Sequence, residues 1–130
     1  MYEAITKDIR VRVEPHYDEQ RSEPDSGRFF WLYTVDITNE SDSSVTLATR
    51  FWQITDANGG REEVKGAGVV GQTPTLEPGQ SFSYTSGCPL RTSSGIMGGS
   101  YRMLDQDGAP FDVEIPAFSL DLPFMQPTVN

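Results

Sequence analysis

FFWLYTVDIT, the stretch at residues 29–38, places an apolar side chain at every odd position and a polar one at the last three even positions. Successive side chains of a β-strand point to opposite faces of the sheet. The odd residues therefore share one face, and Thr34, Asp36 and Thr38 share the other. This alternation predicts a long central strand that packs against a hydrophobic core on one side.

Two further segments alternate in the same way. Residues 9–14 do so strictly and predict a half-buried strand. In residues 45–56 the apolar side chains lie first at odd and later at even positions. One extra residue in a strand produces such a change of face, so we expect a β-bulge near residues 49–51.

Turn residues divide the rest of the chain into short segments. Residues 56–60, Asp-Ala-Asn-Gly-Gly, favour a tight hairpin turn, and Pro78-Gly79 fits the centre of a type II turn. Further strands are predicted at residues 62–70, 81–86, 101–104, 111–115 and 118–122. Eight or so short strands without a convincing amphipathic helix indicate an all-β sandwich or barrel.

The composition is that of one globular domain. The chain has 130 residues, of which 36% are hydrophobic, and no apolar stretch approaches the roughly 18 residues that span a membrane. We expect a single domain over residues 1–130, with a core at about 9–122 and a frayed tail at 123–130. The first eight residues lack a secretory signal pattern, and the single cysteine excludes an internal disulfide. Both features favour the cytoplasm, and the lack of a long apolar stretch argues against a membrane partner.

The charge balance argues against nucleic-acid binding. The formal net charge is -9, and no cluster of Lys and Arg interrupts the acidic sequence. Such a surface repels phosphate backbones, so nucleic acid is not an expected partner. A basic protein or divalent cations would be compatible with it.

A glycine-rich run at residues 66–71, Gly-Ala-Gly-Val-Val-Gly, matches the G-x-G-x-x-G pattern of dinucleotide-binding folds. That pattern needs a following helix to receive the phosphate, but Pro74 and Pro78 would break one here. The run also lacks the Lys of a P-loop. We expect it to serve close packing or a bulge. The alternative is an anion site built from backbone N–H groups, with Gly66, Gly68 and Gly71 as the candidate phosphate ligands.

No other motif indicates an enzyme. Cys88 has only His16 as a potential base, so an inert buried thiol is the favoured interpretation. Residues 105–108 resemble part of a calcium loop, but the first ligand position falls on Met103. Residues 56–59 do not fit a calcium loop either, because its first ligand position falls on Ile54 and its twelfth on Lys65. We therefore predict no catalytic residues, no metal ligands and no cofactor, while divalent-cation binding through Asp105, Asp107 and neighbouring carboxylates is left as a weaker alternative.

Several longer motifs together resemble the ApaG family. They run in the same order over nearly the whole chain, from about Val11 to Leu122. These motifs are WQITDANG at residues 52–59, EVKGAGVVG at 63–71, LEPG at 76–79, YTSGC at 84–88, GSYRM at 99–103 and FDVEIPAF at 111–118. Members often carry a histidine before the tryptophan of the first motif, where this chain has Phe51.

The resemblance implies an immunoglobulin-like or fibronectin III-like β-sandwich of about 7–9 antiparallel strands. It implies a bacterial cytoplasmic protein with no established catalytic residues. It also implies a link to cobalt and magnesium resistance and to diadenosine polyphosphate metabolism. From this we expect a non-catalytic module that binds a protein partner, with self-association left open. The alternative is a nucleotide-binding or pyrophosphate-binding protein that uses residues 66–71.

Overall fold

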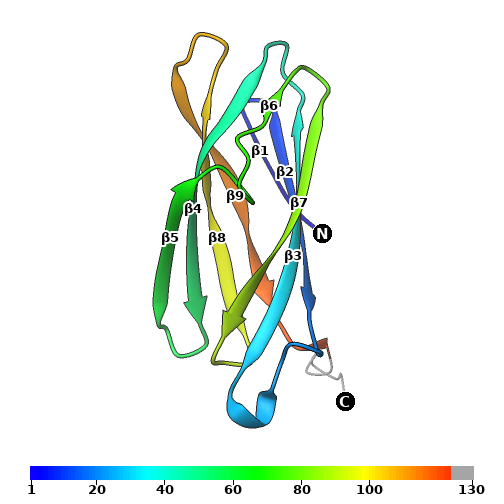
Figure 1. The fold of residues 1–130 in the computed structure, drawn as a ribbon, viewed down its shortest axis with the longest axis vertical. Helices are drawn as coiled ribbons and strands as arrows, with labels where there is room; N and C mark the ends of the chain where they lie inside the picture. The colour runs from blue at the N-terminus through cyan, green and yellow to red at the C-terminus, as the bar shows by residue number, and fades with distance from the viewer. Residues whose placement is uncertain (124–130) are drawn as a thin grey trace.

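The computed structural model describes residues 1–123, which form nine β-strands in two antiparallel sheets (Figure 1). A short 3₁₀ turn, Pro24–Ser26, precedes the third strand. No helix among these residues is long and apolar enough to cross a membrane. The strands are β1 Tyr2–Thr6, β2 Ile9–Tyr17, β3 Phe29–Asn39, β4 Val45–Asp56, β5 Arg61–Ala67, β6 Thr75–Leu76, β7 Ser81–Leu90, β8 Gly95–Leu104 and β9 Pro110–Leu120.

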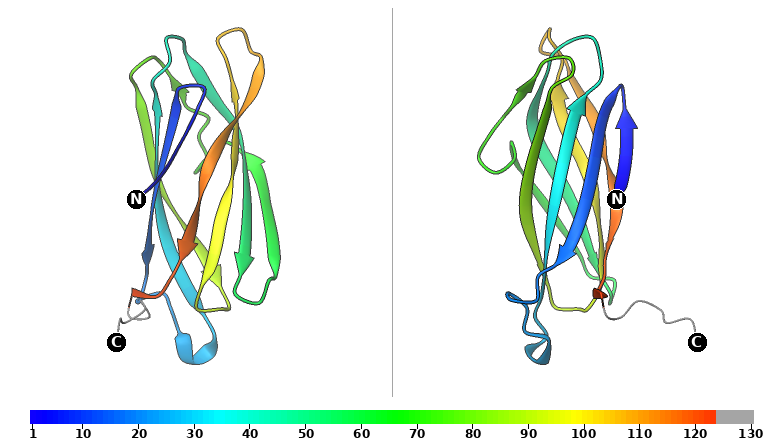
Figure 2. Two further views of the ribbon diagram at one scale, coloured as in Figure 1. Left: turned by 180° about the vertical axis from the view of Figure 1, so that it is seen from behind. Right: turned by 90° about the vertical axis from the view of Figure 1, so that its right-hand side faces the viewer.

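The two sheets face each other as a β-sandwich. One sheet has the strand order β1-β2-β3-β7, and the other has the order β5-β4-β8-β9, with β6 paired to the beginning of β4. In the right-hand view of Figure 2 the first sheet lies in front of the second. The all-β prediction is confirmed, and of its two architectures the sandwich is the one formed.

The central strand is confirmed, since β3 pairs with β2 on one side and with β7 on the other. The bulge in β4 is also present, between Leu47 and Thr49 where β4 pairs with β8. It lies slightly before the expected residues 49–51.

The structure corrects several strand predictions. The prediction at residues 101–104 captured only the end of β8, which begins at Gly95, because three glycines hide the alternation. The two strands predicted at 111–115 and 118–122 are one strand, β9, whose bulge lies opposite Met97–Gly99. The predicted strand at 62–70 ends at Ala67. The short strand β1 was not predicted. Of the tail at 123–130, residues 124–130 lie outside the described residues.

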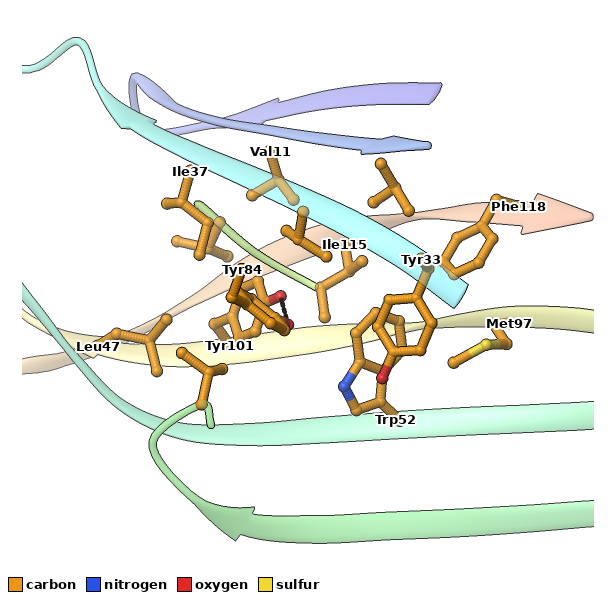
Figure 3. Packing of buried hydrophobic residues seen from close by; sticks show 14 of the residues in the cluster. Val11, Tyr33, Ile37, Leu47, Trp52, Tyr84, Met97, Tyr101, Ile115 and Phe118 are labelled. Atoms are coloured by element: carbon orange, nitrogen blue, oxygen red, sulfur yellow. Dashed lines mark hydrogen bonds between the residues drawn. The ribbon is translucent and has the colours of Figure 1, made fainter. Parts of the chain in front are cut away.

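The core is a single cluster of buried side chains from both sheets. Its first member in the sequence is Ile9 and its last is Leu122. Trp52 of β4 packs in this cluster with the Tyr33 ring at 5.2 Å and the Phe118 ring at 6.0 Å, both edge to face (Figure 3). The Tyr84 and Tyr101 hydroxyls form a buried hydrogen bond between the two sheets. This pairing allows two polar groups to be buried without loss of hydrogen bonding.

The sandwich closes along one side only. On that side β9 packs on β1 and β2. The Glu114 N–H donates to Thr6 Oγ1 at 3.1 Å, and the Ser119 N–H donates to the Tyr2 hydroxyl at 3.3 Å. Among residues 1–123, β5 and β7 make no comparable set of contacts on the other side. The edges of these two strands therefore bound an open side.

Asn39 is the buried polar residue that fixes where the chain crosses between the sheets. Its side chain is fully buried, and Nδ2 donates to the carbonyls of Ser43 and Leu76, both at 2.9 Å. Its Oδ1 accepts from the Ser41 N–H at 2.9 Å, and its own N–H donates to the Gln80 carbonyl at 2.9 Å. One side chain thus holds the β3–β4 connection against the segment that leads into β7.

Replacing Asn39 with alanine should destabilise the protein by about 2–4 kcal/mol, because it leaves several buried backbone groups without hydrogen-bond partners. Urea unfolding measures this loss. The matched control is Asn58→Ala in an exposed turn, for which we expect a change within about 0.5 kcal/mol. Equal losses in the two variants would contradict this role of Asn39.

Candidate functional site

The glycine-rich run leaves the second sheet and makes a tight turn. Gly66 lies in β5, and Gly68 and Gly71 lie in the loop after it. The Val69 and Gln72 backbones exchange two hydrogen bonds of 2.8 Å. Between them, Val70 and Gly71 have φ values of 43° and 79°. Two successive positive φ values define the two-residue turn that joins tightly returning chains, so the predicted strand ends where this turn begins.

The run is held by packing and by backbone hydrogen bonds. Gly68 has φ 61°, and a Cβ at this position would stand 2.1 Å from the Gln72 carbonyl oxygen. Its N–H donates to the Ala48 carbonyl at 2.8 Å. The Arg50 guanidinium donates to the Ala67 and Gly68 carbonyls. These contacts agree with the expected packing role. The element that follows the run is the short strand β6, so the helix that a dinucleotide-binding fold would need is not formed there. Phosphate binding by Gly66, Gly68 and Gly71 stays a prediction.

A groove runs along the open side between β5 and β7. Three adjoining hollows of about 230, 220 and 460 Å³ form it, and Glu62 lines all three. Trp52 and Met97 line the first hollow, together with polar side chains that include Arg50 and Glu62. Phe30 and Arg91 line the widest hollow, at the end of β7. An apolar hollow with a few polar groups at its rim is the usual form of a binding site.

The β7 backbone offers unpaired groups beside this groove. Odd residues of β3 direct their backbone groups toward β7, as the Asn39 N–H does when it donates to the Gln80 carbonyl. Even residues direct theirs toward β2, as the Phe30 carbonyl does when it accepts from the Asp18 N–H. The register pairs odd residues of β3 with even residues of β7. Hydrogen-bonded and non-bonded pairs alternate in an antiparallel ladder, so the even residues of β7 bond to β3. The N–H and C=O groups of the odd residues point away from β3, and no other described strand pairs with them. These odd residues with an N–H group are Ser81, Ser83, Thr85 and Gly87.

The two open edges differ in charge. All ten residues of β7, SFSYTSGCPL, are uncharged. By contrast, β5 has four charged residues among its seven, in the sequence REEVKGA. Charged side chains on an edge strand discourage pairing with another chain. Of the two edges, β7 is therefore the one suited to accept a further strand.

Cys88 faces the core from β7 and is 2% exposed. Burial raises the pKa of its thiol to about 12. His16 lies on the exposed face of β2, so the structure does not bring the two side chains together. Burial also raises the pKa values of Tyr33, Tyr84 and Tyr101. The expected buried thiol is confirmed.

In the two acidic turns, at residues 56–60 and 105–109, the aspartate carboxylates accept hydrogen bonds from backbone N–H groups of the same turn. Asp56 Oδ1 accepts from the N–H groups of Asn58 and Gly60 at 2.9 and 2.8 Å. Asp105 Oδ1 accepts from Asp107 and Ala109 in the same way. Both segments are hairpin turns, as expected. Within residues 1–123 no three His, Cys, Asp or Glu side chains are grouped as metal ligands would be. The absence of a metal site stays a prediction.

Alanine at Gly68 should be far more costly than alanine at Gly71. Both residues have positive φ, but the Gly68 Cβ would meet backbone, whereas nothing lies within 4 Å of the Gly71 Cβ position. We expect Gly71→Ala to cost about 1 kcal/mol and Gly68→Ala to cost about 3 kcal/mol or more. Urea unfolding of the two variants tests this order, and similar losses would contradict the packing role of Gly68.

The Cys88 thiol should react with a disulfide reagent such as DTNB at pH 8 only when the protein opens. A thiol with its pKa raised to about 12 has very little thiolate at this pH, and burial excludes the reagent. The control is the same protein unfolded in urea, in which the thiol should react at once. A comparable rate in the folded protein would show that Cys88 is an accessible nucleophile.

Comparisons with known proteins agree on one family. The model of the ApaG domain matches residues 19–105. Protein ApaG of Brucella canis and Protein ApaG of Brucella anthropi are each 56% identical over 130 residues, and the match covers 100% of this chain and of theirs.

Two solved structures have the same fold at substantial sequence identity. A crystal structure of the putative ApaA protein from Bordetella pertussis has a TM-score of 0.88 at 43% identity, covering 92% of this chain and 97% of that one. An X-ray structure of a structural genomics target has a TM-score of 0.89 at 41% identity, covering 98% and 96%. The resemblance seen in the sequence motifs is thus confirmed, and the chain belongs to the ApaG family.

Proposed function

We propose that this protein is a non-catalytic binding module that takes up an extended segment of another protein as an additional strand on β7. The observation that carries the proposal is that the β7 edge is uncharged and has no described strand paired to its outer side. It is a ten-residue strand without a charged side chain, and its outward backbone groups have no partner strand among residues 1–123. Natural proteins usually protect such edges with charges or prolines, and on β7 only Pro89, next to the last residue, does so, which leaves residues 81–87 as a platform for strand addition.

The groove beside β7 supports the same role. A strand added to β7 would direct alternate side chains toward the hollow above Trp52 and Met97. Backbone hydrogen bonds would supply affinity, and this hollow would supply selectivity for an apolar side chain. A second copy of this chain is the other occupant that the edge could accept, which would make the protein a homo-oligomer.

The proposal has four further parts. We place the protein in the cytoplasm, and we link its partner to cobalt and magnesium resistance, both through the family resemblance. We regard residues 1–130 as one domain. We also assign the sandwich to the immunoglobulin-like or fibronectin III-like kind, because the chain changes sheets between β3 and β4, β6 and β7, and β7 and β8. Greek-key sandwiches of that kind make such crossings.

The substitution Thr85→Pro should abolish partner capture without unfolding the protein. It removes an outward-facing N–H from the middle of β7, and proline is tolerated on edge strands. The matched control is Glu63→Pro, which removes an outward-facing N–H from the β5 edge. Each change also removes one exposed side-chain hydrogen bond, to Thr34 and to Gln53 respectively.

The measurement is affinity purification at native abundance with wild-type, Thr85→Pro and Glu63→Pro baits. Proteins retained by wild type and Glu63→Pro but lost with Thr85→Pro would support strand addition on β7. Ser83→Pro serves as a second variant if Thr85→Pro melts early. Retention of the same proteins by all baits, or recovery of the bait alone as a monomer, would overturn the proposal.

A further inference from the structure

The groove on the open side is basic although the protein as a whole is acidic. The formal net charge is -9, yet half of the ten Lys and Arg residues line the three hollows. Only two carboxylates, those of Asp56 and Glu62, line them as well. The groove-lining basic residues are Arg21, Arg28, Arg50, Arg61 and Arg91.

One oxygen of the Asp56 carboxylate, Oδ1, accepts from two backbone N–H groups of its own turn, and no described salt bridge joins Asp56 to a groove arginine. Arg61 and Arg91 form no salt bridge with any residue in the described part of the chain. Arg28 and Arg21 are each paired only loosely, with Glu23 and with Asp18 at 3.6 Å, and their side chains are 72% and 62% exposed. These arginines therefore keep most of their capacity to donate hydrogen bonds to a ligand.

Arg50 provides a positive charge on the inner wall of the groove. Its guanidinium is held by the Ala67 and Gly68 carbonyls at 3.1 and 3.0 Å, and no described carboxylate lies within salt-bridge distance. It lines the same hollow as Trp52 and Tyr33. A guanidinium has five donors in a fixed plane, so two carbonyl contacts leave donors for a carboxylate. In a partly apolar setting such a pair is stronger than in open water.

We propose that the segment received by β7 is acidic: an extended stretch of a protein partner that places carboxylates against the groove arginines and an apolar side chain in the hollow above Trp52. This inference rests on the proposed function, because it names the chemistry of the strand that β7 accepts. Carboxylates are the groups that arginine binds with two parallel hydrogen bonds.

Two features favour a short acidic segment over a nucleic acid. The arginines alternate with apolar surface, from Phe30 and Leu90 at one end to Trp52 and Met97 at the other. A phosphate backbone has no apolar side chain to place there. In addition, the surrounding charge of -9 opposes a long polyanion. A segment within the groove responds to the nearby arginines, since charges are screened over about 8 Å at physiological salt.

The test is selection from a random dodecapeptide library displayed on phage, with the full chain as the target. We expect the wild-type protein to retain peptides that combine Asp or Glu with one large apolar residue. Thr85→Pro should retain none of them. The double variant Arg28→Gln/Arg91→Gln should bind a selected acidic peptide about three- to tenfold more weakly, as two exposed ion pairs would give.

The control for charge is Arg102→Gln, which removes an exposed arginine of β8 that pairs with Asp112 away from the groove. It should leave the affinity for the same peptide unchanged. Peptides that depend on Thr85 but show no excess of Asp and Glu would overturn the acidic inference and leave strand addition standing. Peptides held equally well by Thr85→Pro would overturn strand addition itself. An equal effect of Arg102→Gln and the double variant would also overturn the acidic inference, since it would reflect net charge alone.

Discussion

The packing of β9 against β1 and β2 is the constraint on which the rest of the structure depends. Two twisted sheets that face each other cross at an angle, so close contact along one side separates them along the other. Here the closed side is fixed by Tyr2, whose ring lies 6.0 Å from that of Phe118 and whose hydroxyl accepts from Ser119. The separation of β5 from β7 and the groove between them follow, whereas the free edge of β7 comes from its place at the end of the first sheet.

Sequence periodicity predicted those strands that bury one face and expose the other. The alternation in residues 29–38 gives β3, and the phase change in β4 marks a real bulge. Strands were missed or divided where glycines, proline or a bulge hide the alternation. Glycines conceal the first half of β8, and Pro116 together with a bulge divided β9 into two predicted strands. The short edge strand β1 has too few apolar residues to be recognised, although it closes the sandwich.

The candidate site could be predicted only in its parts. The sequence shows that residues 81–90 carry no charge, but it does not show that β7 is an edge strand, because that depends on which strand pairs with β3. Likewise, the groove arginines are spread from Arg21 to Arg91 in the sequence and form no basic cluster there. Pairing of distant strands gathers them. The glycine-rich run is the reverse case: its pattern is conspicuous in the sequence and suggests a binding site, but in the structure it forms a tight turn with close backbone contact.

The net charge of the protein and the charge of its groove have opposite signs and act over different distances. As another molecule approaches, the field that survives screening over about 8 Å is mainly that of the net charge of -9, which keeps copies of an acidic protein apart. This repulsion matters because residues 81–87 of β7 form an uncharged edge that could otherwise pair with a second copy. Within the groove, the nearby arginines outweigh the distant carboxylates. The groove therefore discriminates between segments at contact distance, after the edge has been reached, and it does not attract them from afar.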